Sequence, residues 1–360
     1  MNPTILLTKN VLKSSNFFTA LVCGKARHNL RNACTKVPTL KMNNGCEMPA
    51  LGLGTWGATE DYKWIEKLDT SKAPATGRTK PEEMVDAMKC AFDIGYRHVD
   101  TAFLYKNEKQ IGQAIKAKIE DKTLKREDVF LVTKLWNNFH DPKDVRCACE
   151  KSLENLCLSY IDLYLMHTPM GVKRTDDLYD FAPVDKDCKP LFTDTDYVCT
   201  WQAMEKLVED CLCKSIGICN FNLKQLKRLI KKAKIVPQVL QMECHPYLTQ
   251  KELCAYCKCE NIIITAYSPL GSPSRPWAEI AKKHKKTPAQ VLIRYPIELG
   301  YSTIPQSGKS VEFMKQNFDA INFKLCPEDV ECLDKLNADM RFFKFSGAAG
   351  HPHHPFETKK

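Results

Sequence analysis

From residue 38 onward, short apolar runs alternate with longer stretches in which apolar residues recur at helical spacing. Runs such as IDLYLM (161–166) are continuously apolar, which is typical of strands buried on both faces. The pattern predicts eight strands: Ala50–Trp56, Tyr96–Thr101, Val129–Leu135, Ile161–His167, Lys214–Asn220, Val239–Cys244, Ile262–Ser268 and Ser302–Gln306. It predicts eight helices between or after them: Pro81–Ile94, Glu108–Lys118, Lys143–Leu156, Trp201–Leu212, Leu223–Lys232, Gln250–Glu260, Pro288–Glu298 and Val311–Asn317.

Eight strands that alternate with eight helices indicate an α/β protein with a parallel sheet, and eight strands close a (β/α)8 TIM barrel. Ahead of the first strand, TLKMNNGCEMP (39–49) predicts a β-hairpin with Asn44-Gly45 in its turn. We therefore expect a single barrel domain over residues 37–360, with the N-terminal β-hairpin closing the bottom of the barrel.

Composition supports a large globular core, since 44% of the 360 residues are hydrophobic and 27% are charged. No apolar run approaches the ~18 residues of a membrane-spanning helix, so we expect a soluble protein with no membrane partner. The formal net charge is +10, but residues 1–46 hold seven Lys or Arg and no acid. The basic charge thus belongs mainly to this leader, and we expect no nucleic-acid partner.

Residues 1–36 are rich in Ser, Thr and Asn and contain basic but no acidic residues. Two interpretations stay open: a mitochondrial transit peptide, or an extended start of the coding sequence. The expected location is cytoplasmic, with the mitochondrion as the alternative. A second unusual segment is an insertion at about 58–80, which is either a lid over the substrate or an artefact of the gene model.

Eighteen cysteines in a chain of this size indicate reduced thiols rather than a disulfide framework. On a helix, Cys259 would point away from Cys254 and Cys257, so we expect no metal there. The group His351, His353 and His354 lies in a segment with Gly and Pro, and we expect a solvated tail.

Four side chains follow strand ends in a way that suggests chemistry. Asp100, Lys134 and His167 each stand near the C-terminal end of a different strand, where barrel enzymes gather their catalytic groups. Tyr105 follows Asp100 by five residues. A tyrosine hydroxyl has a pKa near ~10 and becomes a usable acid beside a buried lysine, which stabilises the phenolate. Taken singly, these residues also fit a structural ion pair, a core histidine and a packed tyrosine.

Several motifs, in order and spacing, resemble the aldo-keto reductase superfamily, and most closely its aldose and aldehyde reductase branch. They are GYRHVDTAFLYKNE (95–108), LVTKLW (131–136), IDLYLMHTP (161–169), SIGICNFN (215–222), QMECHPYL (241–248), TAYSPLGSPSRPW (265–277) and TIPQS (303–307). The resemblance covers about residues 38–340. It implies a monomeric, metal-free (β/α)8 enzyme that reduces aldehydes or ketones with NADPH.

The resemblance also implies roles for individual residues. Tyr105 would donate the proton, Lys134 and Asp100 would lower its pKa, and His167 would orient the substrate carbonyl. Residues matching the cofactor site are Asn220, Gln241, Tyr267, Ser268, Leu270, Ser272, Ser307 and Asn317. Residues matching the substrate pocket are Trp56, Trp136, His167 and Trp277.

The sequence departs from the family pattern around the cofactor. Gln306 and Phe313 replace the lysine and arginine that usually bind the 2′-phosphate, so NADH is an alternative to NADPH unless Lys309 or Lys315 substitutes. Cys219 replaces a serine beside the nicotinamide. The loop that follows Trp277 is shorter by about fifteen residues, which predicts weaker cofactor binding.

The substrate pocket also departs from the pattern, because Thr168 replaces an aromatic residue next to His167. The loop 170–196 offers Tyr179 and Phe181 as substitutes. The altered loops leave the natural substrate open. An alternative function is a non-catalytic nucleotide-binding barrel that serves as sensor or scaffold, although the four catalytic positions are intact.

Overall fold

The computed structural model describes residues 37–57, 81–271, 277–308 and 310–356. The leader and the 58–80 insertion lie outside the described residues. The described residues all belong to one compact unit that starts at Val37.

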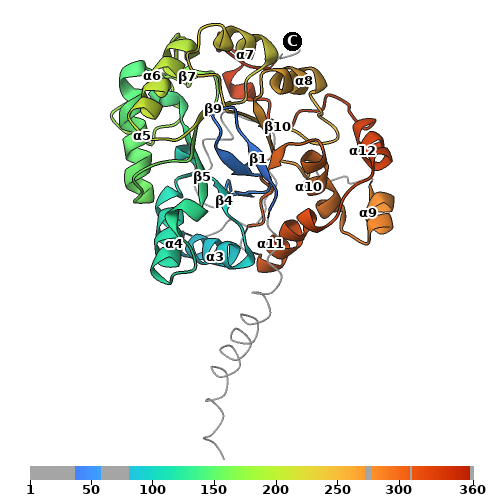
Figure 1. Cartoon of the computed structure of the whole chain (residues 1–360). Coiled ribbons are helices and arrows are strands. Elements are labelled where there is room, and N and C mark those ends of the chain that lie inside the picture. Colours follow the sequence, from blue (N-terminus) through green and yellow to red (C-terminus); the bar gives the residue numbers. More distant parts are fainter. Residues whose placement is uncertain (1–36, 58–80, 272–276, 309, 357–360) are drawn as a thin grey trace, which may run out of the picture. The chain divides into compact units, whose positions relative to one another are not determined.

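Eight parallel strands form the barrel in the order in which they occur along the chain (Figure 1). They are β3 (Leu53–Gly54), β4 (His98–Asp100), β5 (Phe130–Leu135), β6 (Leu163–Met166), β9 (Ile216–Cys219), β10 (Val239–Glu243), β11 (Ile263–Tyr267) and β12 (Ser302–Thr303). Parallel bridges from Leu51 to Thr303 and from Gly54 to Gln306 join the first strand to the last. The sheet therefore closes, as the sequence predicted.

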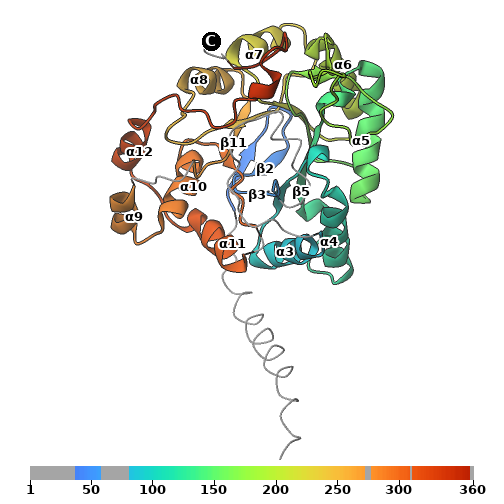
Figure 2. The same cartoon turned by 180° about the vertical axis from the view of Figure 1, so that it is seen from behind.

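The helices surround this barrel (Figure 2). They are α3 (Pro81–Ile94), α4 (Glu108–Glu120), α5 (Pro142–Leu156), α6 (Tyr197–Glu209), α7 (Leu223–Ile230), α8 (Lys251–Cys259), α9 (Ala278–His284), α10 (Pro288–Glu298), α11 (Val311–Phe318) and α12 (Pro327–Asp334). All eight predicted helices are present, whereas α9 and α12 were not predicted. The helix α6 begins at Tyr197 rather than Trp201, because the Asp196 side chain caps it by accepting from the Val198 amide.

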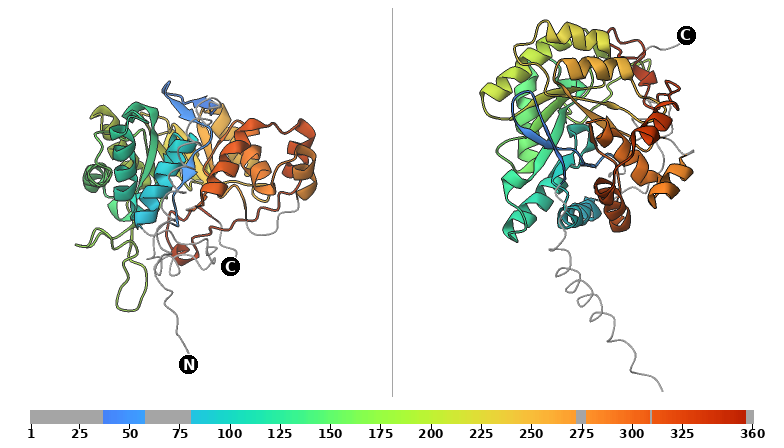
Figure 3. Two further views of the ribbon diagram at one scale, coloured as in Figure 1. Left: turned by 90° about the horizontal axis from the view of Figure 1, so that it is seen from below. Right: turned by 45° about the vertical axis from the view of Figure 1, so that its right-hand side comes forward.

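A β-hairpin closes one end of the barrel. Strands β1 (Thr39–Lys41) and β2 (Glu47–Pro49) pair antiparallel, and Gly45 in the turn adopts φ +87°. The buried side chains of Met42 and Met48 pack against apolar residues of β5, β6 and β10. Figure 3 (left) shows this blue hairpin at one end of the barrel and the dark-red C-terminal segment at the other. The hairpin thus leaves the end with the carboxyl termini of the strands for the site.

The expectation of a solvated tail at His351, His353 and His354 is wrong. His351 is buried, and its Nε2 lies 3.0 Å from the carbonyl oxygen of Gly171. Its ring packs against Phe192 in the small hairpin of β7 (Gly171–Val172) and β8 (Phe192–Thr193). His353 packs against Tyr197. These ring contacts hold residues 351–353 against the barrel. A sequence pattern cannot show contacts between residues so far apart in the chain.

The cysteines behave as the helical spacing indicates. Cys254 and Cys257 are buried on α8 whereas Cys259 is exposed, so the three diverge. Every cysteine of the described residues is a free thiol. Within that part of the chain, no group of three or more His, Cys, Asp or Glu could hold a metal ion, and no helix is long and apolar enough to cross a membrane.

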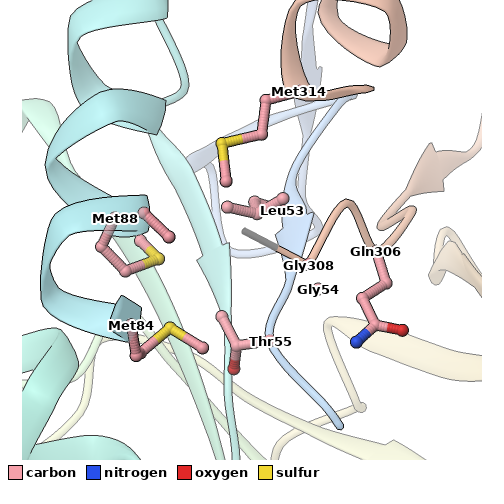
Figure 4. A pocket seen from close by; sticks show the side chains of 9 residues that line it. Leu53, Gly54, Thr55, Met84, Met88, Gln306, Gly308 and Met314 are labelled. Carbon is pink, nitrogen blue, oxygen red and sulfur yellow. The ribbon is translucent and has the colours of Figure 1, made fainter. Parts of the chain in front are cut away.

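A small apolar cavity lies between α3, α11 and the end of β3. Figure 4 shows Met84 and Met88 of α3 and Met314 of α11 beside Leu53, with Gln306 on the other side. None of the four predicted catalytic residues lines this cavity. It is therefore separate from these four residues, although Gln306, one of the positions at which the chain departs from the family pattern, lines it.

Candidate active site

The structure brings the four predicted catalytic residues together at one end of the barrel. Asp100 ends β4, Lys134 lies in β5, and His167 directly follows β6. Because the three strands are parallel neighbours, these residues emerge at the same rim. Tyr105 ends a short 3₁₀ turn (Phe103–Tyr105) that follows β4 and folds back over the same rim.

A buried ion pair lies at the centre of this group. Lys134 Nζ is 2.5 Å from Asp100 Oδ1 and donates to the carbonyl oxygen of Thr101 at 2.9 Å. The second carboxylate oxygen of Asp100 accepts from Gln241 Nε2 at 2.7 Å. Buried charges are costly unless they are paired and hydrogen-bonded, and here both conditions are met.

The phenol of Tyr105 lies directly beside this pair. Its oxygen is 3.4 Å from Lys134 Nζ, and its ring meets the His167 ring at 5.8 Å in an edge-on arrangement. A fixed ammonium at this distance favours the negatively charged phenolate over the phenol. Tyr105 therefore has the electrostatic support that a proton donor needs.

His167 is neutral in this setting. Burial lowers the pKa of His167 well below its usual range, and the positive charge of Lys134 acts in the same direction. Its Nδ1 is buried and has no hydrogen-bond partner among the described residues. A neutral imidazole can donate one hydrogen bond to a carbonyl oxygen without giving up a proton.

The residues predicted to hold the nicotinamide lie on the adjoining strands. Asn220 Nδ2 donates to the carbonyl oxygen of His167 at 2.9 Å, and Asn220 Oδ1 accepts from the Tyr267 hydroxyl at 2.8 Å. Cys219 Sγ is 3.7 Å from Gln241 Oε1 and 3.1 Å from Asn220 Nδ2. The Cys219 thiol thus takes part in the same polar network. A thiol is a weaker hydrogen-bond partner than the serine hydroxyl of the family pattern.

The remaining predicted cofactor residues lie on other elements. Ser307 and Asn317 bond to each other at 2.9 Å. Ser268, just after β11, has φ +50°, and Leu270 is half-buried nearby in the chain. Ser272 lies outside the described residues, as does Lys309. Phe313, at the position where the family pattern has arginine, is 59% exposed on α11. Its side chain carries no charge that could bind a phosphate.

Aromatic rings form one wall of the site. Trp136 meets His167 at 5.1 Å, and its Nε1 donates to the carbonyl oxygen of Phe181 at 3.0 Å. Phe181 is buried against Trp136 and Phe103, and Tyr179 stacks on Phe103 at 5.2 Å. The loop 170–196 therefore does bring Tyr179 and Phe181 to the rim, whereas Thr168 bonds to Asn137.

Two other tryptophans lie in different surroundings. Trp56 packs edge-on against Phe343 at 5.5 Å. Trp277 is 2% exposed and belongs to an apolar cluster with α9, α10 and Tyr247, which contains none of the catalytic residues. The structure thus does not bring Trp277 into the aromatic wall, because the short loop before α9 makes it the N-cap residue of that helix.

The sequence did not predict that Phe343 lies beside the site, nor that Gln241 Nε2 donates to Asp100. Phe343 packs against both Trp56 and Tyr267, at 5.5 and 5.6 Å. It lies more than 70 residues beyond Tyr267 in the sequence, within a stretch of irregular structure. The only signal in the sequence is the aromatic run RFFKF at 341–345.

The comparisons agree with this geometry. A model of the Aldo/keto reductase family matches residues 50–276 and 274–338. The chain belongs to this family. Aldo-keto reductase family 1 member A1-A of Danio rerio is 41% identical over 88% of this chain and 98% of its own length. Prostaglandin F synthase 1 of Bos taurus is 40% identical over 90% of this chain and 99% of its own length.

A solved structure supports the same conclusion. The structure of the aldose reductase from Schistosoma japonicum matches with a TM-score of 0.79 and 37% identity, covering 90% of this chain and all of that one. The chain is accordingly an aldo-keto reductase, an oxidoreductase that reduces carbonyl compounds with NAD(P)H. The relatives give no support to a non-catalytic sensor or scaffold.

The residues present fit a nicotinamide cofactor. Gln241 and Tyr267 lie on the adjacent strands β10 and β11, and Asn220 directly follows the neighbouring strand β9, beside the catalytic group. His167 adds a buried ring nitrogen that has no partner among the described residues. Polar groups of this kind, next to aromatic walls, are typical of a site that orients a flat polar ring.

Proposed function

We propose that this aldo-keto reductase reduces aldehydes or ketones with Tyr105 as the proton donor. The observation that supports the proposal most directly is the chain of contacts from Asp100 to Lys134 to the Tyr105 hydroxyl, at 2.5 and 3.4 Å. The nicotinamide, when bound, supplies a hydride to the carbonyl carbon. Tyr105 gives its proton to the carbonyl oxygen, and Lys134 stabilises the phenolate that remains.

The neighbouring residues position the substrate. His167 donates a hydrogen bond to the carbonyl oxygen, and its low pKa keeps it neutral while it does so. Trp136 and Phe181 form an apolar wall that excludes water from the reacting atoms. Asn220, Gln241 and Tyr267 would hold the nicotinamide.

We further propose NADPH as the preferred cofactor, a monomeric state and a cytoplasmic location. Lys315 is exposed on α11, close in sequence to Ser310 and Asn317, and can supply a cation to the 2′-phosphate. NADH is the alternative because of Gln306 and Phe313. Residues 37–360 would form the single catalytic domain, and residues 1–36 either a transit peptide or an extended start.

The test is the rate of NADPH oxidation, and separately of NADH oxidation, with a generic aromatic aldehyde. We expect turnover with the wild-type protein and a loss of at least ~10²-fold for Tyr105→Phe, the lower end of what general acid catalysis contributes. Cofactor affinity, followed by protein fluorescence, should stay nearly unchanged in this variant. Undiminished turnover by Tyr105→Phe would refute the proposed mechanism.

A further inference from the structure

The carboxylate of Glu243 is fully buried at the end of β10, two residues after Gln241. Its Oε1 accepts from the backbone N–H of Phe342 at 2.8 Å and lies 3.0 Å from His245 Nε2. Its Oε2 accepts from the backbone N–H of Phe343 at 3.0 Å. A buried carboxylate is tolerated only when hydrogen-bond donors satisfy it. The Glu243 carboxylate and the backbone amides of Phe342 and Phe343 therefore fix each other's positions.

A second set of contacts holds the same short segment, residues 341–343, which we name the C-terminal strap. Arg341 Nη2 donates to Gln250 Oε1 at 2.9 Å, and Gln250 Nε2 donates to the carbonyl oxygen of Glu243 at 2.6 Å. The ring of His245 packs on that of Phe342 at 5.2 Å. Each residue of the strap is therefore tied to the end of β10 or to the loop that follows it.

The strap presents one side chain to the site. The Phe343 ring meets Trp56 at 5.5 Å and Tyr267 at 5.6 Å, edge-on in both cases. The Tyr267 hydroxyl in turn bonds to Asn220. Phe343 thus stands between one predicted substrate wall and the ring predicted to stack on the nicotinamide, although it belongs to an irregular segment with no strand or helix to fix it.

We propose that Glu243 is a positioning residue for carbonyl reduction, acting through the two backbone amides that it binds. By fixing the strap, it fixes Phe343 as a wall that limits the width of the substrate beside the nicotinamide. This inference rests on the proposed function, because it concerns the same site. The fixed Phe343 wall makes the reductase selective for narrow carbonyl compounds over wide ones.

The experiment compares wild type, Glu243→Gln, Phe343→Ala and the double variant with benzaldehyde and with 1-naphthaldehyde. We expect Glu243→Gln to raise the KM for benzaldehyde several-fold with little change in kcat. The ratio of kcat/KM values should shift about tenfold toward the wider aldehyde. Phe343→Ala should give the same shift, and the double variant no more than either single one, because both changes remove the same wall.

A matched control is Glu252→Gln, which makes the same substitution at an exposed position on α8. We expect no shift in selectivity for this variant. A loss of kcat at unchanged KM in Glu243→Gln, or fully additive effects in the double variant, would overturn the proposal. Either result would show that Glu243 acts on the barrel in general and not through Phe343.

Amide hydrogen exchange gives a readout that needs no turnover. In wild type, the amides of Phe342 and Phe343 should exchange at least tenfold more slowly than in Glu243→Gln, whereas peptides from β5 and β6 should be unaffected.

If wild type shows no reductase activity, the proposed function fails, and unequal exchange still tests the strap. If Glu243→Gln does not fold, Gln250→Ala loosens the strap from the second set of contacts, with a smaller shift in the same direction. Unchanged exchange and selectivity in the folded variant would refute the role of Glu243.

Discussion

The ammonium nitrogen of Lys134 lies 2.5 Å from a carboxylate oxygen of Asp100, and the two side chains are 0% and 2% exposed. In most ion pairs among the described residues, at least one side chain is more than a third exposed, so solvent screens the pair and it contributes little. This one is shielded from water, so each charge depends on the other. The pair therefore links the stability of the barrel to the chemistry of Tyr105.

Replacing Lys134 by an uncharged residue should lower both the rate of the reaction and the stability of the barrel. We expect Lys134→Met to lower kcat by about 10²–10⁴-fold, because the Tyr105 phenolate loses its support. Since Asp100 is left buried without its counter-ion, the free energy of unfolding should fall by about 3–5 kcal/mol. Steady-state kinetics and urea unfolding measure the two effects.

The control is a second lysine in an ion pair. Lys118 Nζ lies 2.7 Å from Asp93, whose side chain is 51% exposed. Lys118→Met should leave kcat unchanged and cost about 1 kcal/mol or less, since Asp93 can be solvated. Equal losses in the two variants would contradict a special role for the buried pair.

The helix pair α4 and α5 gives a test of packing. A Cβ added at Gly112 would lie 2.2 Å from the carbonyl oxygen of Leu156, so Gly112→Ala must push the two helices apart. We expect a loss of about 1–3 kcal/mol in the free energy of unfolding. Gly350→Ala meets only the Phe192 ring, at 3.9 Å, and should be nearly neutral. The midpoints of denaturant unfolding compare the two variants with wild type. If Gly112→Ala were as stable as wild type, the helices α4 and α5 could move apart without cost.

Two buried histidines predict how stability depends on pH. Burial lowers the pKa of His98 to about 4 and that of His140 to about 3. An unfolded chain takes up these protons near pH ~6.5, whereas the native state does so only near the lowered values. The free energy of unfolding should therefore be fully retained above about pH 6.5 and fall below it, by about 1.4 kcal/mol per pH unit for each histidine.

The measurement is urea unfolding at pH 7, 6 and 5. His140 is suited to a single substitution, because neither ring nitrogen has a hydrogen-bond partner among the described residues. His140→Leu should reduce the slope below pH 6.5 by the contribution of one proton. A slope that is identical in the variant would mean that His140 is protonated in the native state as well.

Cofactor preference can be shifted at the positions where this chain departs from its family. We expect Gln306→Lys to raise the ratio of NADPH to NADH in kcat/KM by about 10–150-fold, which corresponds to one charged hydrogen bond of ~1.5–3 kcal/mol. Gln316→Lys on α11 adds the same charge and serves as the control. If both variants raise the ratio equally, the effect is one of overall charge and not of a phosphate contact.

The sequence predicted most of the barrel because its elements carry local signals. Helices α3 and α10 match the predicted bounds, since each begins at a proline and ends shortly before a glycine. The strand ends placed Asp100, Lys134 and His167 correctly, because a parallel barrel converges them. Trp277, Phe343 and His351 could not be placed in this way, since their positions depend on loop lengths and on contacts between residues far apart in the chain.

The C-terminal strap has a consequence for how the protein is made. A ribosome adds residues 341–343 after every strand and α-helix of the barrel has been translated. The barrel can begin to fold while the chain is still growing, but the wall at Phe343 can form only once residues 341–343 have left the ribosome. A nascent or prematurely truncated chain would therefore carry the catalytic residues without a finished pocket.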